Sequence, residues 1–154
     1  MGSDPFSGQL YFEDFSVGDR FASPSRTITD AHFLFFAGIT GDNHPIHYDE
    51  EYARQTPFGG RVTHGLLVMA MTVLGASPLS HRLEASMIAF VEQGCRFLKP
   101  VLLGDTVHPH HEVVGLEPKR SRGLVRFTTW ITNQRGEKVL EGHHAYLIRR
   151  RPTP

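Results

Sequence analysis

The residues with the clearest chemical potential lie in one short segment, residues 40–49. This segment reads Thr-Gly-Asp-Asn-His-Pro-Ile-His-Tyr-Asp and contains Asp42 and His47. A carboxylate and an imidazole that converge on one water molecule can remove its proton and supply a proton elsewhere. The ordinary pKa of histidine, about 6.5, suits proton transfer in both directions near neutral pH. The segment is therefore a candidate for general acid–base chemistry.

The spacing of the two residues leaves a second interpretation open. Asp42 and His47 are five positions apart, so a regular helix would place them on different faces. Gly41 and Pro45 predict irregular backbone over residues 41–47, and a bend there could turn both side chains toward one point. Gly-Asp and Asn-His-Pro are also common in turns, where Asp42 would only bond its own backbone.

The elements around this segment are predicted to be short helices and one longer one. Thr29 or Asp30 is expected to cap a helix that runs toward Gly38, and Asp49 to cap a second helix over residues 50–54. Residues 64–76 are apolar nearly all round, which predicts a helix about 20 Å long that other structure should enclose.

The second half of the chain has the pattern of strands. Residues 87–93, 106–114, 124–132 and 138–147 each suit a strand, and turn signals separate them. An antiparallel sheet that closes around the apolar helix is the simplest assembly of these parts, so the expected fold class is α+β.

Composition excludes several classes of function. The chain has 154 residues, enough for one domain, and its 16 basic and 16 acidic side chains cancel. We therefore expect no nucleic-acid partner and no binding to an anionic membrane. Cys95 is the only cysteine, residues 1–7 lack the apolar core of a signal peptide, and no apolar stretch reaches the roughly 20 residues of a membrane span. These features predict a cytoplasmic protein.

Four stretches of the chain resemble one known family. Residues 40–49 are similar to the signature of the MaoC-like (R)-specific enoyl-CoA hydratases, in which Gly-Asp is followed by Asn-Pro-aliphatic-His. Residues 11–19, 61–67 and 96–105 resemble the family's N-terminal entry, the start of its central helix and the hairpin after its first long strand. The resemblance covers about residues 11–148.

The resemblance implies a single hot-dog fold, in which an antiparallel sheet wraps around the helix of residues 65–76. It implies one domain over residues 11–148, preceded by a flexible segment, residues 1–10, and followed by a tail, residues 149–154. It also implies a homodimer or a larger dimer-based oligomer, an acyl-CoA thioester as substrate, and no metal or other cofactor.

The resemblance further implies roles for three residues in the reversible hydration of a trans-2-enoyl-CoA to an (R)-3-hydroxyacyl-CoA. Asp42 and His47 fall on the family's catalytic pair, which holds one water molecule. Gly65 falls on the glycine whose backbone N–H receives the thioester carbonyl. An N–H at a helix N-terminus is suited to hold the negative charge that develops on this oxygen.

The segment departs from the family pattern at two places. The family usually has Asn two residues after the catalytic Asp, whereas here Asn43 comes one residue after it and His44 fills the usual position. The serine that many relatives carry on the central helix is replaced by Val73, with Thr72 beside it. Thr72, Asn43 and His44 are therefore possible supporting residues. His64 could contact substrate or could be a structural histidine at the entry to the helix.

The sequence also allows two other functions and one other site. A thioesterase on the same fold would release free CoA thiol, and a non-catalytic acyl-CoA-binding subunit would release nothing. His108, His110, His111, His143 and His144 could be ligands of a metal, but an exposed polar strand explains them better. Arg54 and Arg61 give a weak indication of a carboxylated acyl group.

Overall fold

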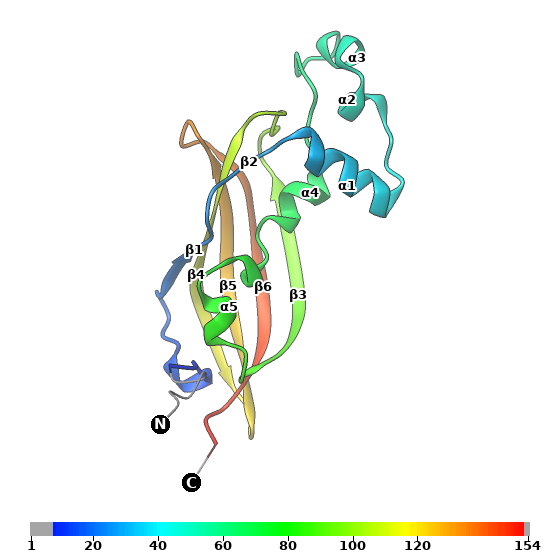
Figure 1. Cartoon of the computed structure of the whole chain (residues 1–154). Helices are drawn as coiled ribbons and strands as arrows, with labels where there is room; N and C mark the ends of the chain where they lie inside the picture. The colour runs from blue at the N-terminus through cyan, green and yellow to red at the C-terminus, as the bar shows by residue number, and fades with distance from the viewer. Residues whose placement is uncertain (1–7, 153–154) are drawn as a thin grey trace, which may run out of the picture.

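The computed structural model describes residues 8–152 and places six strands in one antiparallel sheet (Figure 1). The strands are β1 (Arg20–Ala22), β2 (Arg26–Thr27), β3 (Met87–Phe97), β4 (Thr106–Pro118), β5 (Arg122–Asn133) and β6 (Lys138–Arg149). Their order is β1-β4-β5-β6-β3, and β2 also pairs with β4. Most of the predicted flexible segment, residues 1–10, and the last two residues of the predicted tail lie outside the described part.

The four long strands lie where the sequence predicts them, and all four extend beyond the predicted ranges. Alternation is clearest in β5, where Val125, Phe127, Thr129 and Ile131 are buried and the residues between them are partly exposed. The two short strands β1 and β2 were not predicted, because two or three residues are too few to show a period of two.

The helices lie in two groups (Figure 1). α4 (Gly65–Ala70), the 3-10 turn η2 (Leu74–Ala76) and α5 (Leu79–Arg82) follow one face of the sheet. α1 (Asp30–Thr40), α2 (Pro45–Tyr48) and α3 (Glu50–Arg54) project beyond one end of the sheet, opposite the end where the described part of the chain begins and finishes. The 3-10 turn η1 (Phe12–Asp14) lies near that second end. No helix among residues 8–152 is long and apolar enough to cross a membrane.

The prediction of one continuous helix over residues 64–76 was wrong. α4 ends at Ala70, and η2 begins only at Leu74. Between them Thr72 donates its hydroxyl to the Met69 carbonyl at 2.7 Å and also contacts His144 Nε2 at 3.1 Å. A threonine that bonds its own backbone competes with the helical ladder. The segment is also not fully enclosed, since Leu66 is 57% exposed in the single chain.

The short helices near the chemical segment agree better with prediction. α1 begins after Thr29, whose N–H donates to His32 Nδ1 at 3.0 Å, and runs beyond Gly38 to Thr40. Asp49 caps α3 by accepting a bond from the Tyr52 N–H at 3.0 Å. Residues 41–47 are not irregular throughout, because α2 starts at Pro45 and contains His47. Proline is tolerated at the first position of a helix, where its missing N–H is not needed.

The interior contains two apolar clusters with a polar row between them. One cluster includes Val113 and Phe127, and the other includes Ile131 and Leu140. The row between them pairs His111 with Thr129 across β4 and β5. His111 is fully buried, and its ring centroid lies 6.0 Å from that of buried His144 on β6. The prediction that this histidine-rich stretch is exposed was therefore wrong for His111 and His144.

Candidate active site

The C-terminus of α1 sets the position of Asp42. Gly41 closes this helix with φ of 74°, and its N–H donates to the Ala37 carbonyl at 2.7 Å. Glycine adopts this left-handed conformation without the strain that a side chain would add. The turn sends the chain away from the helix, so the Asp42 carboxylate stands at the start of a loop and is 49% exposed.

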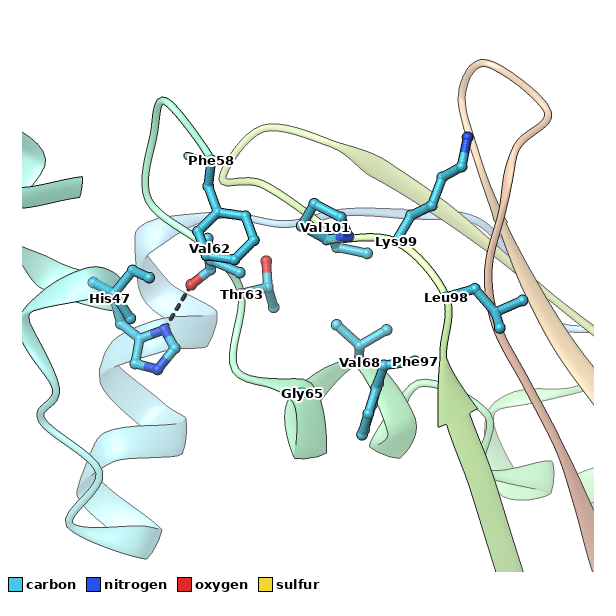
Figure 2. A pocket seen from close by; sticks show the side chains of 12 residues that line it. His47, Phe58, Val62, Thr63, Gly65, Val68, Phe97, Leu98, Lys99 and Val101 are labelled. Carbon is cyan, nitrogen blue, oxygen red and sulfur yellow. Dashed lines mark hydrogen bonds between the residues drawn. The ribbon is translucent and has the colours of Figure 1, made fainter. Parts of the chain in front are cut away.

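His47 approaches this carboxylate from α2. His44 caps the helix, because its Nδ1 accepts a bond from the Ile46 N–H at 3.2 Å. His47 Nδ1 lies 2.6 Å from the Val62 carbonyl oxygen, as Figure 2 shows. A carbonyl only accepts, so Nδ1 carries the proton and Nε2 is unprotonated in the neutral ring. Nε2 lies 3.9 Å from Asp42 Oδ2, too far for a direct hydrogen bond. The structure thus brings the predicted pair together, with the free nitrogen toward the carboxylate.

His64 supports both members of the pair. Its ring stacks on that of His47 with 3.7 Å between centroids and 24° between planes. Its Nε2 lies 3.2 Å from the Asp42 backbone oxygen, which assigns the proton to Nε2. Burial lowers the pKa of His64, and only 2% of the residue is exposed, so the ring is neutral near pH 7.

Tyr48, which the sequence did not single out, and Arg61, which the sequence suggested only as a partner of a carboxylated acyl group, both hold this site together. The Tyr48 hydroxyl lies 3.0 Å from His64 Nε2 and 3.1 Å from the Phe33 carbonyl, so it can accept from the first and donate to the second. Arg61 donates through Nε to the His47 carbonyl at 2.7 Å and through Nη2 to Asp30 at 2.6 Å. The adjacency of Tyr48 to His47 was the only available signal, and it does not reveal these contacts.

Gly65 is the first residue of α4, so its N–H has no acceptor within that helix. The Phe97 ring covers this glycine closely, since an added Cβ would lie 3.2 Å from a ring carbon. Gly65 and His47 line the same pocket, which has a volume of about 420 Å³ (Figure 2). The other lining residues are mostly apolar: Ile46, Phe58, Val62, Thr63, Val68, Phe97, Leu98, Lys99, Pro100 and Val101.

The predicted supporting residues Asn43, His44 and Thr72 make different contacts. Asn43 donates its side-chain amide to the Gly41 carbonyl at 3.3 Å, so it shapes the loop. The His44 N–H lies 3.4 Å from Asp42 Oδ1 and gives the carboxylate a weak partner. Thr72 contacts His144 and Met69, and no hydrogen bond joins it to Asp42 among the described residues. Its hydroxyl is used within the core.

Asp42, His47 and His64 carry the donor atoms of a metal site, but their arrangement does not have the geometry of one. Ligand atoms of Asp42, His47 and His64 lie within 4.8 Å of one another. Two imidazoles stacked nearly face to face direct their lone pairs along parallel planes, whereas tetrahedral Zn²⁺ needs them to converge. His64 Nε2 is also occupied by its bond to Asp42. An ion bound by both rings would require them to leave this stack.

Comparison with known proteins finds one family model, described as MaoC like domain, which matches residues 14–134. A curated (R)-specific enoyl-CoA hydratase from Rhodospirillum rubrum is 35% identical over 138 residues, covering 90% of this chain and 91% of that protein. A 3-hydroxybutyryl-CoA dehydratase from Methylorubrum extorquens is 36% identical, covering 86% of this chain and 80% of its own.

Solved structures show the same architecture. A MaoC-like dehydratase from Rhodospirillum rubrum superposes with a TM-score of 0.80 at 33% identity, covering 94% of this chain and 99% of that one. A Mycobacterium tuberculosis protein described as a double hot-dog fold superposes with a TM-score of 0.76 at 27% identity, covering 96% of this chain and 47% of that one. The α+β fold of this chain is therefore a single hot-dog fold, as predicted.

Proposed function

The chain is an enzyme of the MaoC-like hydratase and dehydratase family, and from this premise we propose that it hydrates a trans-2-enoyl-CoA to an (R)-3-hydroxyacyl-CoA, or catalyses the reverse dehydration. The observation that carries the proposal is the convergence of the unprotonated His47 Nε2 and the Asp42 carboxylate, 3.9 Å apart. Gly65, whose N–H has no acceptor within α4, lines the pocket that His47 also lines.

The proposed mechanism uses the three groups together. Asp42 and His47 hold one water molecule, whose oxygen forms a bond with Cβ while its proton passes to one member of the pair. The π electrons move toward the thioester oxygen, where the Gly65 N–H stabilises the developing charge. A proton from the pair then reaches Cα and the carbonyl re-forms. We assign the acid and base roles to the pair and not to either residue alone.

The charges around the pocket favour an uncharged acyl group. Arg61, which could have paired with a carboxylated acyl chain, is held by Asp30 at 2.6 Å and by the His47 carbonyl. Arg54 is paired with Glu50 at 3.0 Å and does not line the pocket. We therefore propose hydrocarbon acyl chains as the substrate class, in place of the carboxylated group that these arginines suggested in the sequence.

We also propose that two copies associate through β3, in the cytoplasm, where acyl-CoA thioesters occur. β3 is the edge strand of the sheet, and it exposes Ile88, Phe90 and Val91 to between 40% and 52% in the single chain. An edge strand with exposed apolar side chains is a ready partner for a second copy. Sedimentation equilibrium should give twice the mass of one chain.

We retain residues 11–148 as the proposed domain.

Asp42→Asn tests the function directly. Wild-type protein should remove the absorbance of the conjugated enoyl thioester when mixed with short enoyl-CoAs. The Asn variant should slow this reaction by about 10²–10⁴-fold, because it removes one proton-transfer group. Its melting temperature should stay close to that of the wild type, since Oδ2 makes no hydrogen bond to the described residues that stabilises the fold.

The alternative functions give different readouts in the same assay. Release of free thiol, followed with a thiol reagent, would identify a thioesterase. Tight binding of acyl-CoA without turnover, unaffected by Asp42→Asn, would identify a binding subunit. Either result would contradict the proposal.

A further inference from the structure

Thr63 carries a buried hydroxyl that the proposed mechanism does not use. The residue is 3% exposed, and its backbone N–H is fixed by a 2.7 Å bond to the Val101 carbonyl. Among the described residues, the Thr63 Oγ1 atom has no hydrogen-bond partner. Thr63 nevertheless lines the pocket that contains His47 and Gly65. In Figure 2 its oxygen points away from α4, toward the side where Phe58 and Val101 lie.

A buried hydroxyl without a hydrogen-bond partner destabilises the folded protein. Leaving a buried polar atom without a partner costs on the order of 1–3 kcal/mol. Thr72 and Ser77 avoid this cost by bonding a carbonyl three residues earlier, that of Met69 and that of Leu74. Ser23 and Ser86 also have unpartnered buried hydroxyls, but neither residue lines the pocket that contains His47 and Gly65. Thr63 lies two residues before α4 begins, and no carbonyl of the described residues accepts its hydroxyl. A bound molecule in the pocket would supply the missing partner.

The charge distribution indicates which part of the substrate passes Thr63. Lys99 is the only lining residue with a formally charged side chain, and this side chain is 52% exposed. Its Nζ lies 2.6 Å from Glu137 Oε1, so the cation is ion-paired at the solvent-facing end of the pocket. The pocket therefore leads from the buried ring of His47, past Thr63, toward a cation near solvent. The end of the substrate that carries phosphates must face solvent, so its thiol-bearing arm, rather than the acyl chain, follows this path.

The distance between Thr63 and Gly65 limits which group of the substrate the Thr63 hydroxyl can contact. Thr63 and Gly65 are two residues apart, so their Cα atoms are separated by at most about 7 Å. If Gly65 receives the thioester oxygen, Thr63 lies within reach of groups a few bonds along the arm from the sulfur. The first polar group there is an amide, separated from the sulfur by two methylenes. This unit is common to CoA and to the arm of acyl-carrier protein.

We propose that Thr63 is a substrate-binding residue whose hydroxyl hydrogen-bonds the amide nearest the thioester sulfur. This inference rests on the proposed function, because it places the thioester carbonyl at Gly65. It assigns to Thr63 a specificity for thioesters of the phosphopantetheine type over simple alkyl thioesters. A valine at this position would preserve the shape of the side chain and remove the hydrogen bond.

The test pairs two variants with three substrates. Thr63→Val removes the hydroxyl, and Thr63→Ser retains it. The substrates are a four-carbon enoyl-CoA, the N-acetylcysteamine thioester of the same enoyl group, and an S-alkyl thioester in which methylenes replace the amide. We expect Thr63→Val to raise KM about tenfold for the two substrates that carry the amide and to leave the alkyl thioester unchanged, as for the loss of one hydrogen bond. Thr63→Ser should stay within about threefold of wild type.

Two outcomes would overturn the inference. One is an unchanged KM for the N-acetylcysteamine thioester in Thr63→Val. The other is an equal rise for the alkyl thioester, which would indicate a change in pocket shape. A separate binding measurement distinguishes failure of this inference from failure of the proposed function. If the wild type binds saturated butyryl-CoA without turning over any enoyl thioester, weaker binding by Thr63→Val still supports the contact, and equal binding rejects it.

Discussion

At the scale of single residues, one hydrogen bond determines which nitrogen of His47 can accept a proton. The Val62 carbonyl holds Nδ1–H at 2.6 Å, so the lone pair on Nε2 faces Asp42. The neutral ring of His64 stacks on the ring of His47, and its Nε2–H donates to the Asp42 backbone oxygen. A neutral neighbour adds no positive charge beside the free nitrogen of His47.

A prediction at this scale concerns His64 as a positioning residue. His64→Phe keeps an aromatic ring against His47 but removes one of two donors near the Asp42 carbonyl, the other being the Tyr48 hydroxyl at 3.1 Å. We expect kcat to fall about tenfold, equivalent to one lost hydrogen bond, because the loop that carries Asp42 becomes less well ordered. KM should change by less than about twofold, because we place the substrate on His47 and Gly65. Steady-state kinetics on an enoyl-CoA would measure both, and an unchanged kcat would show that His64 is only a packing residue.

At the scale of elements, the geometry of the pair depends on how α1 ends and α2 begins. Gly41 has φ of 74°, and Pro45 starts the turn that carries His47. The backbone between them fixes the approach of Asp42 to His47 without any side chain from α4. This is why the absence of the helix serine, with Val73 at its position and Thr72 bonded to His144, is compatible with the observed pair.

A matched pair of glycine variants tests this conclusion. Gly41→Ala and Gly136→Ala place a side chain at the same φ of 74°, the first beside Asp42 and the second in the turn between β5 and β6. Each should lower the free energy of unfolding by about 1 kcal/mol through backbone strain. Only Gly41→Ala should also reduce kcat, by about tenfold or more. Chemical denaturation and kinetics give the two quantities, and an equal loss of kcat in both variants would contradict the local role of Gly41.

At the scale of the whole molecule, two buried imidazoles make the fold sensitive to acid. Burial lowers the pKa of His111 to about 4 and that of His144 to about 4. In the unfolded chain the pKa of histidine is about 6.5, so between these values the unfolded state binds protons that the folded state does not. Their contribution to stability is fully present above pH 6.5 and is lost as the pH falls toward 4.

We therefore expect the free energy of unfolding to decrease by roughly 3 kcal/mol for each of these histidines between pH 6.5 and 4. His111→Gln removes one titrating ring from the core, so the dependence on pH should become shallower. His143→Gln, on the exposed neighbour of His144, should change the dependence less than His111→Gln, because burial, ahead of the charge of His143, is the main cause of the lowered pKa of His144. Urea denaturation over this pH range measures the slope. Identical slopes in wild type and His111→Gln would show that His111 does not contribute.

The sequence by itself determined the residue types at the site and the main strands. Four stretches, residues 11–19, 40–49, 61–67 and 96–105, led to the family, and strand-like residue patterns separated by turn signals located four long strands. These features are readable because they depend on local pattern: a glycine for a left-handed turn, a cap before a helix, a period of two in a half-buried strand.

Only the tertiary structure decided how these residues are held. Three hydrogen bonds at the site and in the core join residues far apart in the sequence. They are His47 with Val62, His64 with Asp42 and Thr72 with His144, which are 15, 22 and 72 positions apart. No local pattern encodes such contacts, because they arise when separate elements pack together. The same packing ended the central helix at Ala70, turned His111 inward and left the Thr63 hydroxyl without a partner in the pocket. Composition and spacing indicated the chemistry of the pair, and long-range packing determined its tautomer, its support and its surroundings.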